Sequence, residues 1–451
     1  MTSFGRIAWL ACLLFVSACP GNSIPPADVA IDIPRDAMGP DIITETGGVN
    51  DAVSPAFDAG PAPACTAMAA ARHIVDRPGG DRAQDPSSFV SVTGGYLVGL
   101  RRIDSAAPDA GLNDAGRLPI VRDSADLLAL DADGMPRGTT VSLYDGVPMG
   151  TTPDGPLLFS GGSSAFAVFQ EVRGTASAPD FMLRLQSTTV DAMGMGPLPT
   201  LLRDHYPRPS MAQLGDRNLV GVTVRFDIDP DGGIPTATPT AMYLSPSGMN
   251  LRPLDVNINS YVPMDVNEPV MRGADDGGSY YVYRSNGHVG FLRFAPNGVI
   301  DPRGAVEVNA PAIGTLDDAA SVSDGVIAAS SRQSGTTTEV RVIVSGPRGA
   351  LRLDRVLETY MGEGPTVATV VPAYGGVAVL WRRGVDAAAR VRFAIVAPDG
   401  VVRAGPMDLL PAPGIEGRVL AVVDGRTVAF VVRDGMAPRW GYSFGRACLP
   451  Q

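Results

Sequence analysis

The chain has 451 residues, of which 45% are apolar and 18% are charged. This composition can bury a sizeable core and excludes a mostly disordered chain. The formal net charge is −11 and every cationic side chain is arginine, so a basic nucleic-acid-binding surface is not expected and lysine-dependent chemistry is excluded.

The first 19 residues have the pattern of a secretory signal. Arg6 gives a positive start, and residues 7–16 form an apolar stretch too short to span a bilayer. The run VSAC follows and ends at Cys19, and it resembles the lipobox of bacterial lipoproteins. This resemblance implies that Cys19 is lipidated and becomes the mature N-terminus. The alternative is an ordinary secretory signal cleaved near Ala18.

The residues after this cysteine predict a tether and a location. Pro20 stands where the retention signal of lipoprotein sorting would place aspartate, which favours the outer membrane. Residues 20–64 are rich in Pro, Ala, Asp and Gly without a sustained period, which is typical of a flexible linker. We therefore expect a signal peptide at 1–19, a tether at 20–64 and a folded domain at 65–451, anchored in the cell envelope by its lipid.

A glycine followed by an apolar strand recurs about every fifty residues from residue 87 onward. The seven occurrences begin at Gly95, Gly162, Gly215, Gly278, Gly325, Gly376 and Gly425. A further apolar strand follows each one, and flanking strands complete four per repeat, which is typical of β-propeller blades. The sequence therefore predicts an all-β fold, a seven-bladed β-propeller. Six or eight blades stay open because the first unit is irregular, and a β-helix or two sandwiches fit the repeat less well.

The two ends of the folded domain predict how the propeller closes. The last repeat reaches Cys448 with only three strands, and an unassigned segment begins at Met68. We expect this segment to supply the missing fourth strand. Closure would bring Cys65 and Cys448 together, and outside the cytoplasm they would form a disulfide.

One acidic motif is a candidate metal site. Asp227, Asp229 and Asp231 precede a glycine, and they resemble the start of a calcium loop in which alternate carboxylates converge on the cation. The ninth and twelfth positions are Pro235 and Thr238, which are not strong ligands. An acidic turn between the second and third strands of a blade is therefore the favoured interpretation, with calcium as the one candidate cofactor.

The other candidate residues point to no catalytic group. His73, His205 and His288 lack ligand spacing, and no G-x-S-x-G motif marks a nucleophile. Trp381 and Trp440 lie in predicted strands and are interpreted as packing residues. The arginine pairs at 101–102 and 382–383 are interpreted as solvated strand ends, with the alternative that they bind an acidic group.

The domain resembles the β-propellers of secreted bacterial lipoproteins in periodicity alone, over residues 65–448. We expect a non-catalytic binding or scaffolding module that presents loop faces to an envelope protein or surface polymer, and an envelope-assembly factor is a variant of this hypothesis. The alternative is a carbohydrate-active hydrolase or lyase that uses carboxylates at the propeller axis.

Two observations would discriminate between these hypotheses. Buried carboxylates with raised pKa values would favour the enzyme. An exposed apolar patch would favour the binder. The sequence names no ligand and no oligomeric state.

Overall fold

The computed structural model describes residues 68–449 except 75–81, 106–119, 147–154, 161–163, 176–177, 190–199, 204, 214–218, 228–235, 245–250, 258–266, 275, 323–324, 362–365, 385–387, 412–414, 425 and 435–440. The predicted signal peptide and tether, with Cys19 and Cys65, lie outside the described residues. Within the described part the fold is all-β, as the sequence predicted, and the sheets are antiparallel. Among the described residues, no helix is long and apolar enough to cross a membrane.

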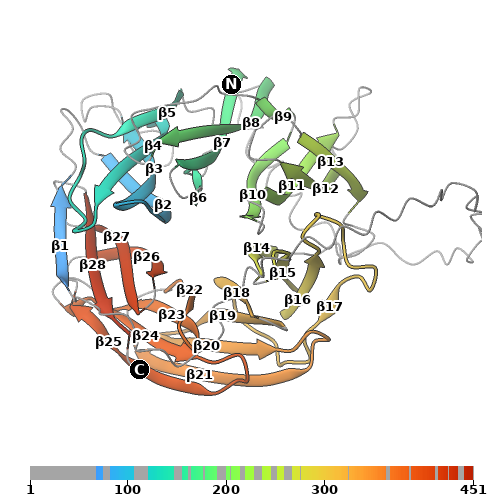
Figure 1. The fold of residues 1–451 in the computed structure, drawn as a ribbon, viewed down its shortest axis with the longest axis vertical. Helices are drawn as coiled ribbons and strands as arrows, with labels where there is room; N and C mark the ends of the chain where they lie inside the picture. Colours follow the sequence, from blue (N-terminus) through green and yellow to red (C-terminus); the bar gives the residue numbers. More distant parts are fainter. Residues whose placement is uncertain are drawn as a thin grey trace, which may run out of the picture. The chain divides into compact units, whose positions relative to one another are not determined.

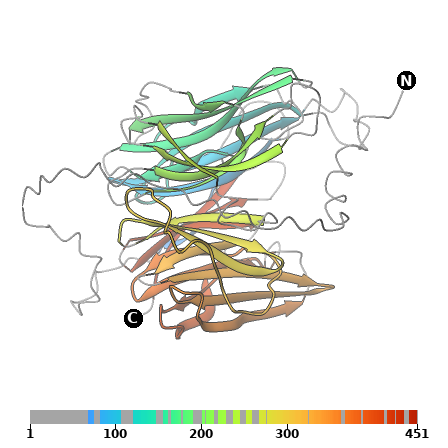
Figure 2. The same ribbon diagram turned by 90° about the vertical axis from the view of Figure 1, so that its right-hand side faces the viewer.

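The described strands form seven four-stranded sheets (Figures 1 and 2). The first three sheets contain β2 (Arg82–Val92), β3 (Gly95–Ser105), β4 (Ile120–Asp131) and β5 (Val141–Gly146); β6 (Leu157–Ser160), β7 (Ser164–Thr175), β8 (Ala178–Thr189) and β9 (Thr200–Arg203); and β10 (His205–Gln213), β11 (Leu219–Asp227), β12 (Thr236–Leu244) and β13 (Leu251–Asn257).

The next three sheets repeat the same strand order. They contain β14 (Asn267–Gly273), β15 (Ser279–Ser285), β16 (His288–Phe294) and β17 (Val306–Glu307); β18 (Asp318–Val322), β19 (Gly325–Ser334), β20 (Thr337–Ser345) and β21 (Leu351–Met361); and β22 (Thr369–Ala373), β23 (Gly376–Arg383), β24 (Arg390–Val396) and β25 (Val402–Pro411).

The last sheet joins the two ends of the described chain. Its order is β1 (Met68–Ile74), β28 (Gly441–Cys448), β27 (Thr427–Asp434) and β26 (Ile415–Asp424). β1 pairs antiparallel with β28, with His73 opposite Tyr442. The segment that begins at Met68 therefore supplies the fourth strand of this sheet, as the sequence predicted.

The glycines that open two of the described repeats, Gly325 and Gly376, have a steric cause. Gly325 begins β19 and Gly376 begins β23, each as the second strand of its sheet. A Cβ atom at either position would overlap a backbone carbonyl of the third strand, at Ser345 or Val396. Only glycine fits where the second strand approaches the third so closely, and this requirement produced the repeat visible in the sequence.

The core lies between neighbouring sheets. One cluster packs Ile327 and Val342 of one sheet against Val379 and Trp381 of the next. Because both faces of an inner strand are covered, β18 is buried at every position, including its polar residues Asp318 and Ser321. Asp318, at the start of this strand, belongs to a candidate site.

The first strands of the sheets contact one another in series. β2 contacts β6, and the contacts continue through β10, β14, β18, β22 and β26, which in turn contacts β2. Figure 1 shows the first strands β14, β18 and β22 on the inside and the fourth strands β17, β21 and β25 on the outside. Side chains on the first strands of several sheets can therefore meet.

Candidate active site

A buried carboxylate connects the first strands of four sheets. Asp318 begins β18, and only 1% of its side chain is exposed. Its Oδ1 accepts hydrogen bonds from Arg272 of β14 and from the backbone N–H of Ala319. Its Oδ2 accepts from Arg418 of β26 at 2.5 Å and from the N–H of Val370 in β22 at 3.0 Å. These donors neutralise a charge that burial would otherwise make costly.

The neighbouring carboxyl group, Asp317, has different partners. Its Oδ1 accepts from the hydroxyls of Thr315 at 2.6 Å and Ser331 at 3.0 Å, and its Oδ2 accepts from the N–H of Ala368 at 3.0 Å. Burial raises the pKa of Asp317 from 3.8 to about 6, although these three hydrogen bonds and the charge of Arg418 act in the opposite direction. The hydrogen bonds come from neutral groups, so they do not fully offset desolvation.

Asp317 and Asp318, which we call the inner carboxyl pair, therefore differ in chemistry. Asp318 faces two guanidinium groups and two backbone donors, and these hold it in one geometry. Asp317 exchanges a proton near pH 6 and adjoins the exposed Thr315. A carboxyl group with such a pKa can act as a general acid or base near neutral pH.

The two arginines of this site keep part of their surface in solvent. The side chains of Arg272 and Arg418 are 37% and 34% exposed. Arg418 also donates from Nε to the hydroxyl of Thr369 at 3.0 Å, and that hydroxyl donates to the carbonyl of Val419. The guanidinium groups are thus fixed beside the inner carboxyl pair, where they can attract an anionic group.

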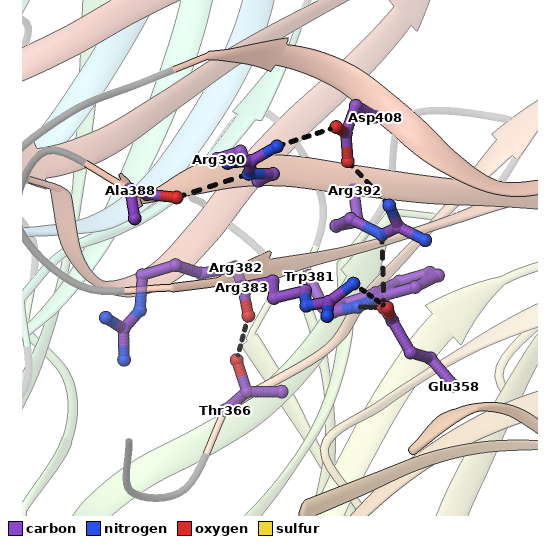
Figure 3. A network of polar contacts seen from close by, with 9 residues as sticks. All are labelled: Glu358, Thr366, Trp381, Arg382, Arg383, Ala388, Arg390, Arg392 and Asp408. Atoms are coloured by element: carbon purple, nitrogen blue, oxygen red, sulfur yellow. Dashed lines mark hydrogen bonds and ion pairs between the residues drawn. The ribbon is translucent and has the colours of Figure 1, made fainter. Parts of the chain in front are cut away.

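A second polar cluster connects the fourth strand of one sheet with the second, third and fourth strands of the next (Figure 3). Glu358 of β21, with 8% of its side chain exposed, accepts hydrogen bonds from Trp381 Nε1 at 2.8 Å and Arg383 Nη1 at 2.6 Å, both from β23. It also accepts from Arg392 Nε of β24 at 3.1 Å. Arg392 continues the cluster to Asp408 of β25, at 2.6 Å.

Asp408 completes this cluster at the surface. It accepts from Arg390 Nη1 at 3.0 Å, and Arg390 also donates from Nε to the carbonyl of Ala388. Partial burial would raise the pKa of Asp408, but the hydrogen bonds and charges of Arg392 and Arg390 outweigh it, so the pKa is lowered. We call Glu358, Trp381, Arg383, Arg390, Arg392 and Asp408 the outer network; each of its two carboxylates bonds two arginines.

The residues predicted to bind calcium are only partly placed. Asp227 is the last residue of β11, and β12 begins at Thr236, so the motif falls between the second and third strands of its sheet, as expected. The side chain of Asp227 and all of Asp229 and Asp231 lie outside the described residues. Among the residues that are described, no group of three or more His, Cys, Asp or Glu side chains could hold a metal ion. Calcium at this motif stays a prediction.

Of the three cysteines with predicted roles, the structure describes only Cys448. Cys448 is the last residue of β28 and is disulfide-bonded. Its predicted partner Cys65 and the predicted lipidation site Cys19 lie outside the described residues. The pairing of Cys65 with Cys448 and the lipidation of Cys19 stay predictions.

The three histidines and two tryptophans singled out in the sequence are partly described by the structure. His73, His205 and His288 lie in β1, β10 and β16, which belong to three different sheets. The Nδ1 atom of His288 is 3.0 Å from the carbonyl oxygen of Ala310. Trp381 is fully buried in the core, as predicted for a packing residue, whereas Trp440 lies outside the described residues.

The arginine pair at 382–383 ends β23, as predicted, and Arg383 keeps 42% of its side chain exposed, but both side chains also have hydrogen-bond partners. Arg383 is held by Glu358 in the outer network, and Arg382 donates from Nη1 to the carbonyl of Gly384 at 3.1 Å. Arg383 thus reaches the neighbouring sheet, whereas Arg382 bonds the carbonyl of the residue that follows its own strand.

Sequence reasoning missed the inner carboxyl pair. Asp317 and Asp318 directly precede the small apolar run of β18, which is a first strand, and Arg418 lies in the corresponding strand β26. The signal available in the sequence was a pair of acidic residues at the start of a strand made mostly of small apolar residues. The sequence pattern does not show that β18 and β26 approach each other, so it could not predict that Arg418 bonds Asp318.

No protein-family model and no curated protein matches the chain. Solved structures of similar shape include the polysaccharide lyase Uly1, at 8% identity over 81% of this chain and 90% of that chain, with a TM-score of 0.46. A PL25 ulvan lyase has 7% identity over 70% and 80%, with a TM-score of 0.43. A family 117 glycoside hydrolase of Zobellia galactanivorans has 10% identity over 59% and 84%, with a TM-score of 0.34.

These comparisons contradict the expected non-catalytic binding or scaffolding module. The similar structures are polysaccharide lyases and a glycoside hydrolase, which agree better with the alternative of a carbohydrate-active enzyme. The sequence analysis gave this alternative less weight because the partners of the inner carboxyl pair lie on other strands, so no local pattern displays the pair's surroundings. At such low identity and TM-score, the role of each residue has to come from this chain's own chemistry.

Proposed function

We propose that this chain is a carbohydrate-active enzyme, a hydrolase or lyase, in which Asp317 transfers the proton. The observation that carries the proposal is the place of Asp317 in the fold: it directly adjoins Asp318 and the two arginines that Asp318 fixes, and burial there raises its pKa to about 6. Perturbed carboxyl groups of this kind gather at catalytic sites. A carboxyl group with a raised pKa, which the sequence analysis set as the sign of an enzyme, directly precedes the inner strand β18 and supports the proposal.

The arrangement favours the lyase over the hydrolase. Glycoside hydrolysis uses two carboxyl groups that both act on the substrate, whereas Asp318 is already committed to two arginines and two backbone donors. Elimination from an acidic sugar needs one base and a cation that neutralises the sugar carboxylate. Asp317 and the exposed edges of Arg272 and Arg418 can supply these.

The elimination can be written with Asp317 as the base. Ionised Asp317 removes the proton next to the sugar carboxylate, a carbon–carbon double bond forms, and the bond to the leaving glycosidic oxygen breaks. That oxygen takes up the proton from Asp317, which returns the enzyme to its starting state. Arg272 and Arg418 stabilise the negative charge that develops on the sugar carboxylate.

The test is cleavage of a panel of acidic and neutral polysaccharides by the purified chain. Ultraviolet absorbance of an unsaturated product reports the lyase, and new reducing ends without that absorbance report the hydrolase. We expect Asp317→Asn to lower the rate at least about a hundredfold, while Asp399→Asn, in an exposed turn, leaves it unchanged. An uncut panel, or an Asp317→Asn variant as active as the parent, would contradict the proposal.

We also propose that the seven sheets are the blades of a seven-bladed β-propeller. The series of first-strand contacts and the pairing of β1 with β28 support this architecture. The bonded state of Cys448 supports closure by a disulfide to Cys65. Peptide mapping with and without reduction should recover Cys65 linked to Cys448, and two free thiols would count against closure.

The location of the protein is a further proposal from the signal region. Lipidation of Cys19 would anchor the chain to the outer membrane, and residues 20–64 would tether the enzyme within reach of a surface polymer. Mass spectrometry of protein extracted from membranes should find acyl chains on Cys19. A mature chain that begins elsewhere would overturn the anchor without affecting the catalytic proposal.

A further inference from the structure

A pocket of about 360 Å³ adjoins the outer network. It is lined by Tyr360, Met361, Arg383, Gly384, Ala388 and Arg390. Two arginines therefore face the pocket, and among the lining residues that the structure describes none is acidic. Both arginines are paired with carboxylates of the outer network, yet both still line the pocket and keep part of their surface in solvent.

The two arginines are held in place before any ligand arrives. Arg383 bonds the buried Glu358, and its guanidinium lies 5.7 Å from the ring centroid of Tyr360. Arg390 bonds Asp408 and the carbonyl of Ala388. Their side chains nevertheless remain 42% and 44% exposed. Cations fixed in this way lose little conformational freedom on binding an anion.

We propose that this pocket binds a carboxylate or sulfate group of an acidic glycan. The anionic chemistry follows from Arg383 and Arg390, and planar guanidinium groups suit both kinds of oxyanion. Met361, which is 76% exposed, offers an apolar flank for the C–H face of a sugar ring. The choice of a glycan rests on the proposed function, whereas the choice of an anion does not.

The strand directions place the pocket and Asp317 at the same end of their sheet. Asp317 directly precedes the first strand, β18, and Met361 ends the fourth strand, β21. In an antiparallel four-stranded sheet, the start of the first strand and the end of the fourth strand lie at the same end. A glycan lying across that end could reach Asp317 with one sugar and the pocket with another.

The test is calorimetric binding in an Asp317→Asn background, where the proposed enzyme does not consume its ligand. The probes are an oligogalacturonate, a neutral malto-oligosaccharide and inorganic sulfate. We expect Arg390→Gln and Arg383→Gln each to weaken oligogalacturonate binding about tenfold. Arg355→Gln is the matched control, because Arg355 is exposed on β21 outside the pocket.

The outcomes separate the pocket from the proposed function. Binding that Arg390→Gln and Arg383→Gln leave unchanged, or equal binding of the neutral oligosaccharide, would overturn the pocket even if the enzyme cleaves glycans. Tight binding that these variants lose would support the pocket even if no glycan is cleaved. Sulfate that binds as tightly as oligogalacturonate would overturn the assignment to a glycan.

Discussion

Asp317 and Asp318 lie at the inner strand β18, whereas Glu358 and Asp408 lie on the outer strands β21 and β25. In the outer network each carboxylate bonds two arginines, and the pKa of Asp408 is lowered. At the inner pair only Asp318 bonds arginines, and the pKa of Asp317 is raised. The comparison teaches that burial among neutral hydrogen-bond donors raises the pKa of a carboxyl group, whereas exposure and arginine partners keep the pKa low.

The largest expected effect is on the stability that Asp318 provides. Asp318→Ala should lower the free energy of unfolding by about 3–4 kcal/mol, because two arginines and two backbone donors lose a buried partner. Urea denaturation would measure the loss. Asp399→Ala, in an exposed turn, is the matched control and should cost less than about 1 kcal/mol. Equal losses in the two variants would show that Asp318 does not hold the four sheets together.

The second effect is a dependence of stability on pH that comes from Asp317. Its pKa is about 6 in the folded protein and near 3.8 when unfolded, so the folded state binds more protons between these values. Stability is therefore highest below pH 3.8 for this group and falls by about 2–3 kcal/mol as the pH rises through 6. Urea denaturation at a series of pH values should show this decline in the parent and not in Asp317→Asn. Identical profiles would refute the raised pKa.

A smaller effect is expected in the outer network. Glu358→Gln keeps an acceptor for Trp381 but removes the charge that faces Arg383 and Arg392. The free energy of unfolding should fall by about 1–2 kcal/mol, because the carboxylate is buried while Arg383 is partly solvated. Thermal and urea unfolding would measure it. If Glu358→Gln lowered the free energy of unfolding as much as Asp318→Ala, the outer network would contribute as much stability as the inner carboxyl pair, and the comparison would fail.

The smallest effect is expected from Arg390→Gln. Its partner Asp408 is 43% exposed, and pairs between such exposed groups contribute less than about 1 kcal/mol. Unfolding of this variant should therefore match that of the parent closely. A large loss of stability would mean that Arg390 supports the fold, and its effect on anion binding could then not be read as a direct contact.

Much of the fold could be predicted from the sequence. Gly325 and Gly376 mark the second strands because no Cβ fits beside the third strand, and the segment from Met68 takes the place left open in the last sheet. The site could not be predicted in this way. The pKa of Asp317 depends on Thr315, Ser331 and Ala368, and Arg418 reaches β18 from a strand 100 residues away. Such contacts depend on packing between sheets, which local patterns do not encode.

The most direct test of the central claim is the pH dependence of acidic-polysaccharide cleavage by the parent and by Asp317→Asn. If Asp317 is the base, kcat/KM of the parent should rise with pH, reach half its plateau near pH 6 and level off above it. Asp317→Asn should be at least about a hundredfold slower and lack this step. A parent profile without a step near pH 6, or the same step in Asp317→Asn, would contradict the assignment of Asp317.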